Sequence, residues 1–199
     1  NPDSVNNYSM KPYGIFVNDD GSIVVWTLEW LVTYDQNGVL LNKANVKDTL
    51  GDTINGKTYY MSTGLTGDGQ YYYFGDSYGE DVIKVTKDGK LAGRYSGVNV
   101  TGSILIKNDK IYVADKGLDK VVVLDKNMNK LAEYPMKEHF NYMGSADDYI
   151  LLVSSNRVNF YDSNMTLFNS VSLLPGDMQV WGISQSGGEI VILAVGVKN

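Results

Sequence analysis

Histidine and cysteine, which supply many catalytic and metal-binding groups, are scarce in this 199-residue chain, which has one histidine and no cysteine. Without cysteine the chain has no disulfide framework, zinc–thiolate site, iron–sulfur cluster or thiol nucleophile. The single histidine, His139, follows Glu138, and these two residues could act as an acid–base pair. A surface or capping role explains His139 more simply, and we therefore predict no catalytic residue.

Carboxylates gather in two segments and could together hold a hard cation such as Ca²⁺, which takes six or more oxygen ligands. They are Asp76, Glu80, Asp81, Asp115 and Asp119. No Asp-x-Asp-x-Asp-Gly loop accompanies them, so solvated loop charges are the simpler interpretation. We predict no metal and no cofactor. A quinone- or haem-linked enzyme would also find few ligands in a chain with a single histidine.

The charge and hydropathy of the chain exclude two classes of partner. It has 17 Lys and Arg against 23 Asp and Glu, a net charge of −6, whereas a nucleic-acid binder usually shows a basic excess. Its longest apolar run, at residues 189–196, has the length of a strand and is too short to span a membrane. The chain does not begin with methionine, so we expect a processed chain or an internal fragment.

A repeat of about 40 residues organises the chain. Five segments start with a glycine and continue into a turn and an apolar run; the glycines are Gly14, Gly64, Gly102, Gly144 and Gly182. Their spacings are 50, 38, 42 and 38 residues, and the long first interval indicates an insertion within residues 47–57. We expect the five glycines at equivalent positions of innermost strands, where they allow close approach.

Strand signals come in groups of four within each repeat. In the third repeat, apolar runs at residues 103–107, 110–114, 120–124 and 130–134 are separated by turn residues. No segment predicts a helix of convincing length. Four-stranded antiparallel units at this period are typical of β-propeller blades, so the predicted fold class is all-β, a propeller of four-stranded blades.

The repeat predicts about four and a half blades, which would be a partial propeller. The units span residues 11–45, 57–97, 98–137 and 140–174, with a half unit at 180–199 and an N-terminal extension at 1–10. An open sheet edge invites pairing, so we expect the strand from Ile190 to Val195 to pair with a strand outside residues 180–199. That strand could come from further sequence of a six- to eight-bladed propeller, from another subunit or from the N-terminal segment.

Two repeats carry a family resemblance. Residues 12–25 (PYGIFVNDDGSIVV) followed by 31–40 (LVTYDQNGVL) resemble an NHL-type propeller repeat. Residues 110–115 (KIYVAD) with 120–125 (KVVVLD) are similar to the same repeat. In the second repeat Lys87 stands where the first, third and fourth have Asp35, Asp125 and Asp162. The family includes both enzymes and pure binding modules, so it implies a fold and not a reaction.

The resemblance also suggests an alternative function. Propeller lactonases resemble this fold and hold a channel metal with a Glu, an Asn and an Asp. Their glutamate of the first blade has no equivalent beside Gly14, where Tyr13 stands. A metal-dependent hydrolase of the propeller-lactonase type is therefore the alternative that we keep, and carboxylates converging within about 5 Å would favour it.

Loops at one end of the predicted blades would form a common face with many aromatic and polar residues, suited to protein loops or sugar rings. The candidate binding residues are Tyr13, Trp30, Asp76, Tyr78, Asp115, Asp119, Tyr142, Arg157 and Trp181. The simpler alternative is that the aromatic rings pack between blades. We expect a non-catalytic recognition or scaffold domain that binds a protein or glycan through one face, and an extracellular or surface-associated location.

Overall fold

All of the regular structure that can be assigned in the chain is β-strand. The computed structural model describes residues 12–27, 30–46, 64–75, 80–99, 101–154, 156–173, 178–186 and 189–196, and these ranges contain no helix. It follows that no helix in the described part of the chain could cross a membrane. The prediction of an all-β chain is confirmed. The chain divides into two compact units, residues 1–101 and 102–199.

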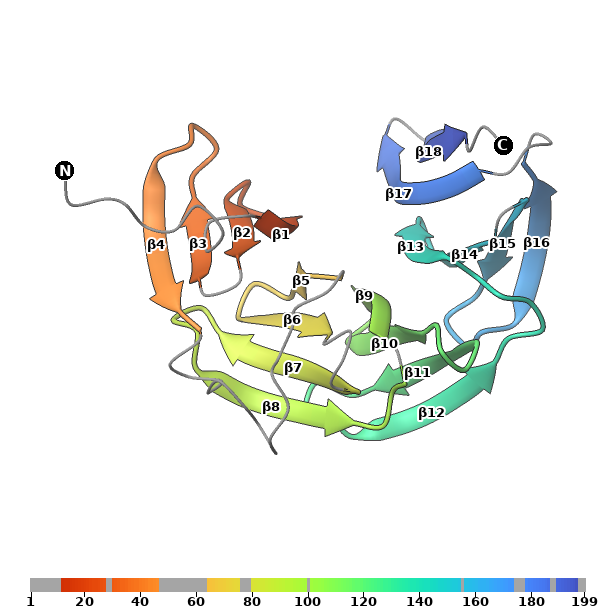
Figure 1. Ribbon diagram of the computed structural model, residues 1–199, viewed down its shortest axis with the longest axis horizontal. Coiled ribbons are helices and arrows are strands. Elements are labelled where there is room, and N and C mark those ends of the chain that lie inside the picture. Colours follow the sequence, from red (N-terminus) through yellow and green to blue (C-terminus); the bar gives the residue numbers. More distant parts are fainter. Residues whose placement is uncertain are drawn as a thin grey trace. The chain divides into compact units, whose positions relative to one another are not determined.

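The first unit contains two antiparallel sheets, in each of which the strands lie side by side in chain order (Figure 1). One sheet consists of β1 (Pro12–Val17), β2 (Ile23–Thr27), β3 (Trp30–Tyr34) and β4 (Leu40–Asn45). The other consists of β5 (Thr66–Gly67), β6 (Tyr71–Gly75), β7 (Asp81–Thr86) and β8 (Leu91–Ser96). The N-terminal extension and the insertion at residues 47–57 lie outside the described residues.

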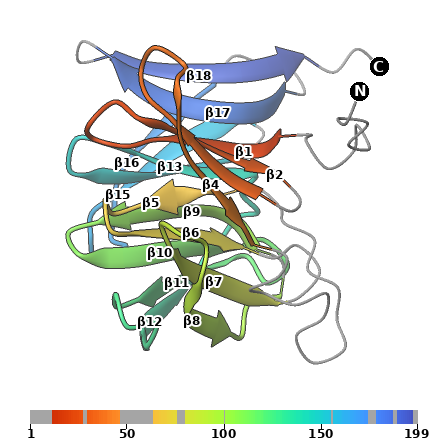
Figure 2. The ribbon, with the colours of Figure 1, turned by 90° about the vertical axis from the view of Figure 1, so that its left-hand side faces the viewer.

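The second unit contains three sheets of the same kind. Two have four strands in chain order: β9 (Thr101–Lys107), β10 (Lys110–Asp115), β11 (Lys120–Leu124) and β12 (Lys130–Pro135), then β13 (Tyr142–Ala146), β14 (Tyr149–Val153), β15 (Arg157–Tyr161) and β16 (Leu167–Ser172). The third sheet pairs β17 (Met178–Ser186) with β18 (Glu189–Gly196), which run side by side in Figure 2.

In every four-stranded sheet, a side chain accepts at least one backbone N–H group in the turn between the third and fourth strands. In three sheets an aspartate, Asp35, Asp125 or Asp162, accepts the backbone N–H groups two and four residues further on, at 2.8–2.9 Å. In the second sheet the equivalent residue is Thr86, whose Oγ1 accepts the N–H four residues further on at 3.0 Å. The alignment of Lys87 with the three aspartates was therefore wrong by one residue, because a hydroxyl replaces the carboxylate.

The fourth residue of each of these turns has a left-handed backbone. In the first unit it is Gly38 or Gly89, with φ of 81° and 79°. In the second unit it is Met128 or Met165, with φ of 68° and 59°. Glycine adopts this conformation without steric cost, whereas a residue with a Cβ is strained there. Both methionine side chains are buried, at 5% and 7% exposure, so packing holds them in place.

Alternation along the strands places one face of each sheet against the next sheet in its unit. Val24, Tyr112 and Leu151 occupy equivalent register positions of the second strand, and all three are 0% exposed. Their partners on the third strand are Thr33, Val123 and Phe160. Each belongs to the core that its sheet shares with the following one. The repeat predicts that these three positions and Val191 are equivalent and are buried or exposed together. The three are buried alike, but the prediction is wrong for Val191, which is 54% exposed because no later sheet lies beside it among the described residues.

Four of the five repeat glycines lie on the first strand of a sheet. These are Gly14, Gly102, Gly144 and Gly182, whereas Gly64 precedes β5 and corrects that part of the prediction. The reason is the length of β5, which has only two residues. A Cβ added at Gly14 would lie 3.1 Å from the Leu65 Cβ, so glycine allows a close approach there.

The outer strand of the two-stranded sheet is apolar and has an open edge among the described strands, as the sequence predicted. β18 pairs with β17 over eight residue pairs, and no other described strand lies beside it. Val191 and Leu193 are 54% and 64% exposed on one face, while Ile190 and Ile192 pack against the core of the preceding sheet. Pairing of this edge with a further strand stays a prediction.

Candidate functional site

The nine candidate binding residues fall into two groups. The side chains of Trp30, Asp115, Asp119, Tyr142 and Arg157 are described, whereas those of Tyr13, Asp76, Tyr78 and Trp181 lie outside the described residues. By backbone, Tyr13 belongs to β1 and Trp181 to β17. Of the five described residues, Trp30 belongs to the first unit and the other four to the second, so the second unit is the place to look for a shared site.

Three of the described candidates are engaged in packing or ion pairing. Trp30 is half-buried, with the Lys43 Nζ 4.1 Å from its ring centroid. Asp115 is 0% exposed, and its carboxylate lies 3.8 Å from the Lys120 Nζ. Tyr142 is half-buried against the core beneath β14 and β15. The Asp115 carboxylate is therefore closed to solvent, whereas the rings of Trp30 and Tyr142 are exposed in part.

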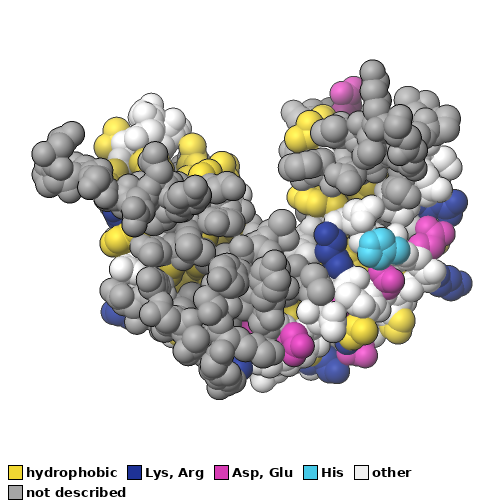
Figure 3. Space-filling view, viewed as in Figure 1, with side chains coloured by type: hydrophobic (Ala, Val, Ile, Leu, Met, Phe, Trp, Pro, Cys, Tyr) yellow, Lys and Arg dark blue, Asp and Glu magenta, His cyan; other side chains and the backbone are white. Residues whose placement is uncertain are grey.

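The two remaining candidates, Asp119 and Arg157, meet the segment that links β12 to β13. The Oδ1 of Asp119 lies 2.6 Å from Nδ1 of His139, and both side chains are partly exposed. The Arg157 guanidinium donates to the Glu138 carboxylate at 3.2 Å. Thus His139 pairs with Asp119, whereas the sequence suggested Glu138 as its partner. Figure 3 shows the single histidine, in cyan, on the surface beside acidic and basic side chains.

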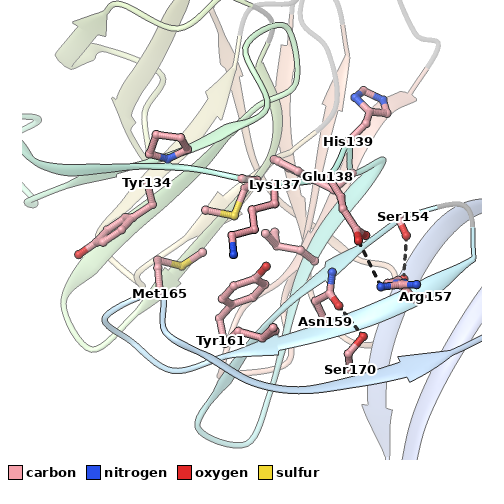
Figure 4. Close-up of a pocket in the computed structure, with 15 residues that line it drawn as sticks. Tyr134, Lys137, Glu138, His139, Ser154, Arg157, Asn159, Tyr161, Met165 and Ser170 are labelled. Carbon is pink, nitrogen blue, oxygen red and sulfur yellow. Dashed lines mark hydrogen bonds and ion pairs between the residues drawn. The ribbon is translucent and has the colours of Figure 1, made fainter.

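A cavity of about 380 Å³ opens next to this cluster, between the outer strands of the second unit's two four-stranded sheets. Its size lies within the range of ligand-binding pockets. Its lining is Tyr134, Pro135, Met136, Lys137, Glu138, His139, Phe140, Leu152, Ser154, Arg157, Asn159, Tyr161, Met165, Leu167 and Ser170. Apolar side chains form most of the interior, and polar and charged side chains stand around it (Figure 4).

The pocket results from strand alternation. Arg157, Asn159 and Tyr161 are every second residue of β15 and therefore share the face that looks toward the preceding sheet. The Ser170 hydroxyl donates to the Asn159 amide oxygen at 2.7 Å, which fixes one wall. Met165 reaches the pocket from its left-handed turn, whose backbone is tied to Asp162.

Charge is distributed unevenly in this pocket. Its lining has two cations, Lys137 and Arg157, and one anion, Glu138, in a chain whose net charge is −6. Arg157 is neutralised by Glu138, whereas Lys137 has no ion pair or hydrogen bond with any residue that the structure describes. Burial raises the pKa of Tyr161, and the Glu138 charge adds to this effect, so the phenol stays neutral and can donate a hydrogen bond.

Sequence reasoning found Arg157 but missed most of the pocket. Met136, Lys137, Tyr161 and Met165 were not singled out, because each is an ordinary residue type at a strand end or turn. The alternation of Arg157, Asn159 and Tyr161 was the available signal, but alternation alone does not tell a packed face from an open one.

Two of the five carboxylates considered for a metal pair with cations. Asp81 pairs with Arg94 at 3.3 Å and Asp115 with Lys120 at 3.8 Å. No group of three or more His, Asp or Glu side chains that could hold a metal ion occurs among the residues that were located. Asp76 lies outside the described residues. The described part of the chain therefore does not offer the converging carboxylates that the hydrolase alternative needs.

Comparison with known proteins identifies the fold. No protein-family model matches the chain, and no curated protein matches it. Among solved structures, the Neurospora crassa Pan2 WD40 domain is 15% identical with a TM-score of 0.60, over 86% of this chain and 52% of that one. Virginiamycin B lyase from Staphylococcus aureus is 14% identical with a TM-score of 0.62, over 97% and 86%. The chain spans only 52% and 60% of the first two structures that it matches, the WD40 domain and BBS1N.

These likenesses show that the sheets are β-propeller blades; among the described residues four sheets have four strands and one has two. The fold class predicted from the repeat is thereby confirmed. The similar structures include a WD40 domain, a lyase and the Myxococcus xanthus glutaminyl cyclase, which is 14% identical with a TM-score of 0.58 over 92% and 85%. Because both binding domains and enzymes share this fold, function must be argued from the site.

Proposed function

We propose that this chain is a non-catalytic recognition domain that binds a protein partner through the pocket between β12 and β15–β16. The observation that carries this proposal is a pocket of about 380 Å³ with an apolar interior, a polar rim and one cation, Lys137, without a described partner. Apolar interiors with a few polar groups at the edge are the usual design of ligand sites. A protein is favoured over a glycan because the pocket accepts an inserted side chain, whereas sugars stack on exposed aromatic faces.

The arrangement around His139 also supports binding over catalysis. Its Nδ1 is held by Asp119, and the nearby Ser154 hydroxyl bonds Asn156 and the Arg157 carbonyl oxygen. A serine nucleophile would need its hydroxyl to be hydrogen-bonded to the histidine ring that activates it. His139 and Asp119 therefore serve to fasten the β12–β13 link to the loop before β11, together with the Met136 N–H bond to the Asp119 carbonyl at 2.7 Å.

We also propose that the blades are of the NHL type. The support for this finer assignment is the pattern of residues 12–25, 31–40, 110–115 and 120–125 and the shared aspartate turns. It implies no reaction by itself.

A selection experiment with two matched variants tests the proposed function. The full chain would be screened against a displayed library of random peptides, and the selected peptides would be compared on the Ser170→Trp and Asn169→Trp variants. Ser170 lines the pocket, whereas Asn169 points from the same strand to the opposite face; both are exposed, so neither change should disturb the core. Equal urea midpoints of the two variants would establish that both are folded.

We expect selected peptides to bind the wild type and Asn169→Trp equally, and Ser170→Trp at least about tenfold more weakly, because a tryptophan ring would occupy the space of an inserted side chain. Selected peptides that bind all three proteins equally would show that the pocket is not the site of recognition.

A further inference from the structure

The ammonium group of Lys137, an exposed residue at the rim of the recognition pocket, has no described partner. In Figure 4 the Lys137 side chain extends over the pocket, and its nitrogen points toward Tyr161 and Asn159. Neither of these groups is an anion at neutral pH, since the pKa of the Tyr161 phenol is raised further above its ordinary value. The one carboxylate of the lining, Glu138, is paired with Arg157, so the Lys137 ammonium is left to lower the free energy of a bound anion.

The second cation of the pocket cannot play this part, because Arg157 already donates to Glu138 at 3.2 Å. The pocket therefore offers one available positive charge, which suits a single carboxylate better than a dianionic phosphate. Net attraction of an anion is unexpected in a chain of net charge −6, so this local charge distinguishes the pocket from the rest of the surface.

The apolar interior indicates what must accompany the carboxylate. Met136, in the link after β12, and Met165, in the turn before β16, both line the cavity, as does Tyr134. Methionine side chains are unbranched and polarisable, so they adapt to aromatic and aliphatic groups alike. A cavity of about 380 Å³ has room for one large side chain together with its neighbouring groups.

We propose that the pocket recognises an acidic peptide segment, in which one large apolar side chain enters between Met136 and Met165 and a carboxylate close to it pairs with Lys137. This inference rests on the proposed function and names the class of partner. A peptide is favoured over a free amphiphilic acid because β16 forms one side of the pocket, and all six of its residues are exposed. β16 is the last strand of its sheet, and no described strand covers its outer edge, so its backbone can pair with an extended peptide.

Three capped heptapeptides test this chemistry on the full chain by fluorescence anisotropy. The first places phenylalanine before two glutamates in a glycine–serine background, the second replaces both glutamates with glutamine, and the third replaces phenylalanine with alanine. The proteins are the wild type, Lys137→Met and Lys87→Met, the last being a matched loss of charge at an exposed turn of the first unit. 4-Phenylbutyrate serves as the free acid.

We expect the glutamine peptide to bind the wild type roughly 1.5- to fivefold more weakly than the glutamate peptide, the range for one exposed ion pair. Lys137→Met should remove this preference and Lys87→Met should keep it. This result would assign the preference to the contact between the glutamate carboxylate and the Lys137 ammonium. The alanine peptide should lose roughly ten- to a hundredfold in affinity, because a buried aromatic side chain contributes most of the contact.

Equal affinity of the glutamate and glutamine peptides for the wild type would overturn the proposal, as would a preference that Lys137→Met leaves unchanged. Binding of 4-phenylbutyrate as tight as that of the glutamate peptide would overturn the choice of a peptide. If library peptides of another composition bind in a manner sensitive to Ser170→Trp, the acidic chemistry fails while the proposed recognition function stands. If no peptide distinguishes Ser170→Trp from the wild type, both fail.

Discussion

Met165 lies in a turn, and its side chain forms part of the pocket wall. We predict that its glycine variant is more stable than its alanine variant, which is the reverse of the usual order. The residue has φ of 59° and is 7% exposed. Replacing it with alanine removes the buried side chain and keeps a Cβ in the left-handed conformation. Replacing it with glycine removes the same side chain and also the strain.

The difference between the two variants can be worked out from the two backbone terms. A left-handed residue with a Cβ costs about 1–2 kcal/mol, and glycine costs about 0.4–1 kcal/mol through the greater freedom of its unfolded chain. Met165→Gly should therefore be about 0.5–1 kcal/mol more stable than Met165→Ala. Both should be less stable than the wild type by about 2–4 kcal/mol, as expected for a buried methionine.

Met143 provides the matched control for this comparison. It lies in the same core cluster, is 2% exposed, and belongs to strand β13 without a positive φ. At this position Met143→Ala should be more stable than Met143→Gly by about 0.5–1 kcal/mol, since alanine fits a strand and restricts the unfolded chain. Equilibrium urea unfolding, followed by circular dichroism, measures all four variants. The same order of alanine and glycine at both positions would refute the left-handed turn and the strain assigned to Met165.

Three further predictions concern a turn, an acid titration and a sheet edge. Asp125→Ala should lower the free energy of unfolding by about 1 kcal/mol in urea titrations, because two backbone N–H groups lose their acceptor at 2.8 Å. Asp125→Asn keeps one oxygen there and should lower it by less than half as much. Equal losses in the two variants would count against the turn bonds. Hydrogen bonds from Ser22 hold the pKa of Asp20 below its ordinary 3.8. The stability that the Asp20 carboxylate contributes is therefore present above pH 3.8 and is lost as the pH falls through the lower pKa of the folded state. Asp20→Asn should flatten the acid side of the stability–pH curve, and an unchanged curve would exclude a contribution of Asp20 to acid stability. If the strand from Ile190 to Val195 pairs on its far side, all of its amides should resist hydrogen exchange, whereas fast exchange at alternate amides would show an open edge.

The repeat made the architecture predictable. Strand period and Asx-type turns are local properties, so Gly14, Asp35 and their equivalents could be recognised from spacing alone. The alignment of Lys87 with the turn aspartates shows the limit of this approach. The residue that accepts the turn hydrogen bond there is Thr86, with a hydroxyl in place of a carboxylate. Spacing identifies a turn, but it does not say which side chain closes it.

The pocket could not be predicted in the same way, because it depends on how far the outer strands of two packed sheets diverge. Asp115 was chosen as a loop carboxylate and is completely buried, whereas Met165 was not chosen and forms a pocket wall. Arg157 was chosen as a residue of a loop face, whereas the structure places it in β15, where strand alternation directs it to the pocket. Whether a strand face is filled or open depends on side-chain volumes from segments distant in sequence.

The claim that the pocket is the recognition site is tested most directly by methyl NMR of the methionines with a selected peptide present. The chain has seven methionines, and Met136 and Met165 line the pocket, whereas Met128 and Met143 are buried elsewhere in the second unit. We predict that the methyl resonances of Met136 and Met165 shift in proportion to occupancy while those of Met128 and Met143 stay in place. Binding that leaves both pocket methyl groups unshifted would contradict the account.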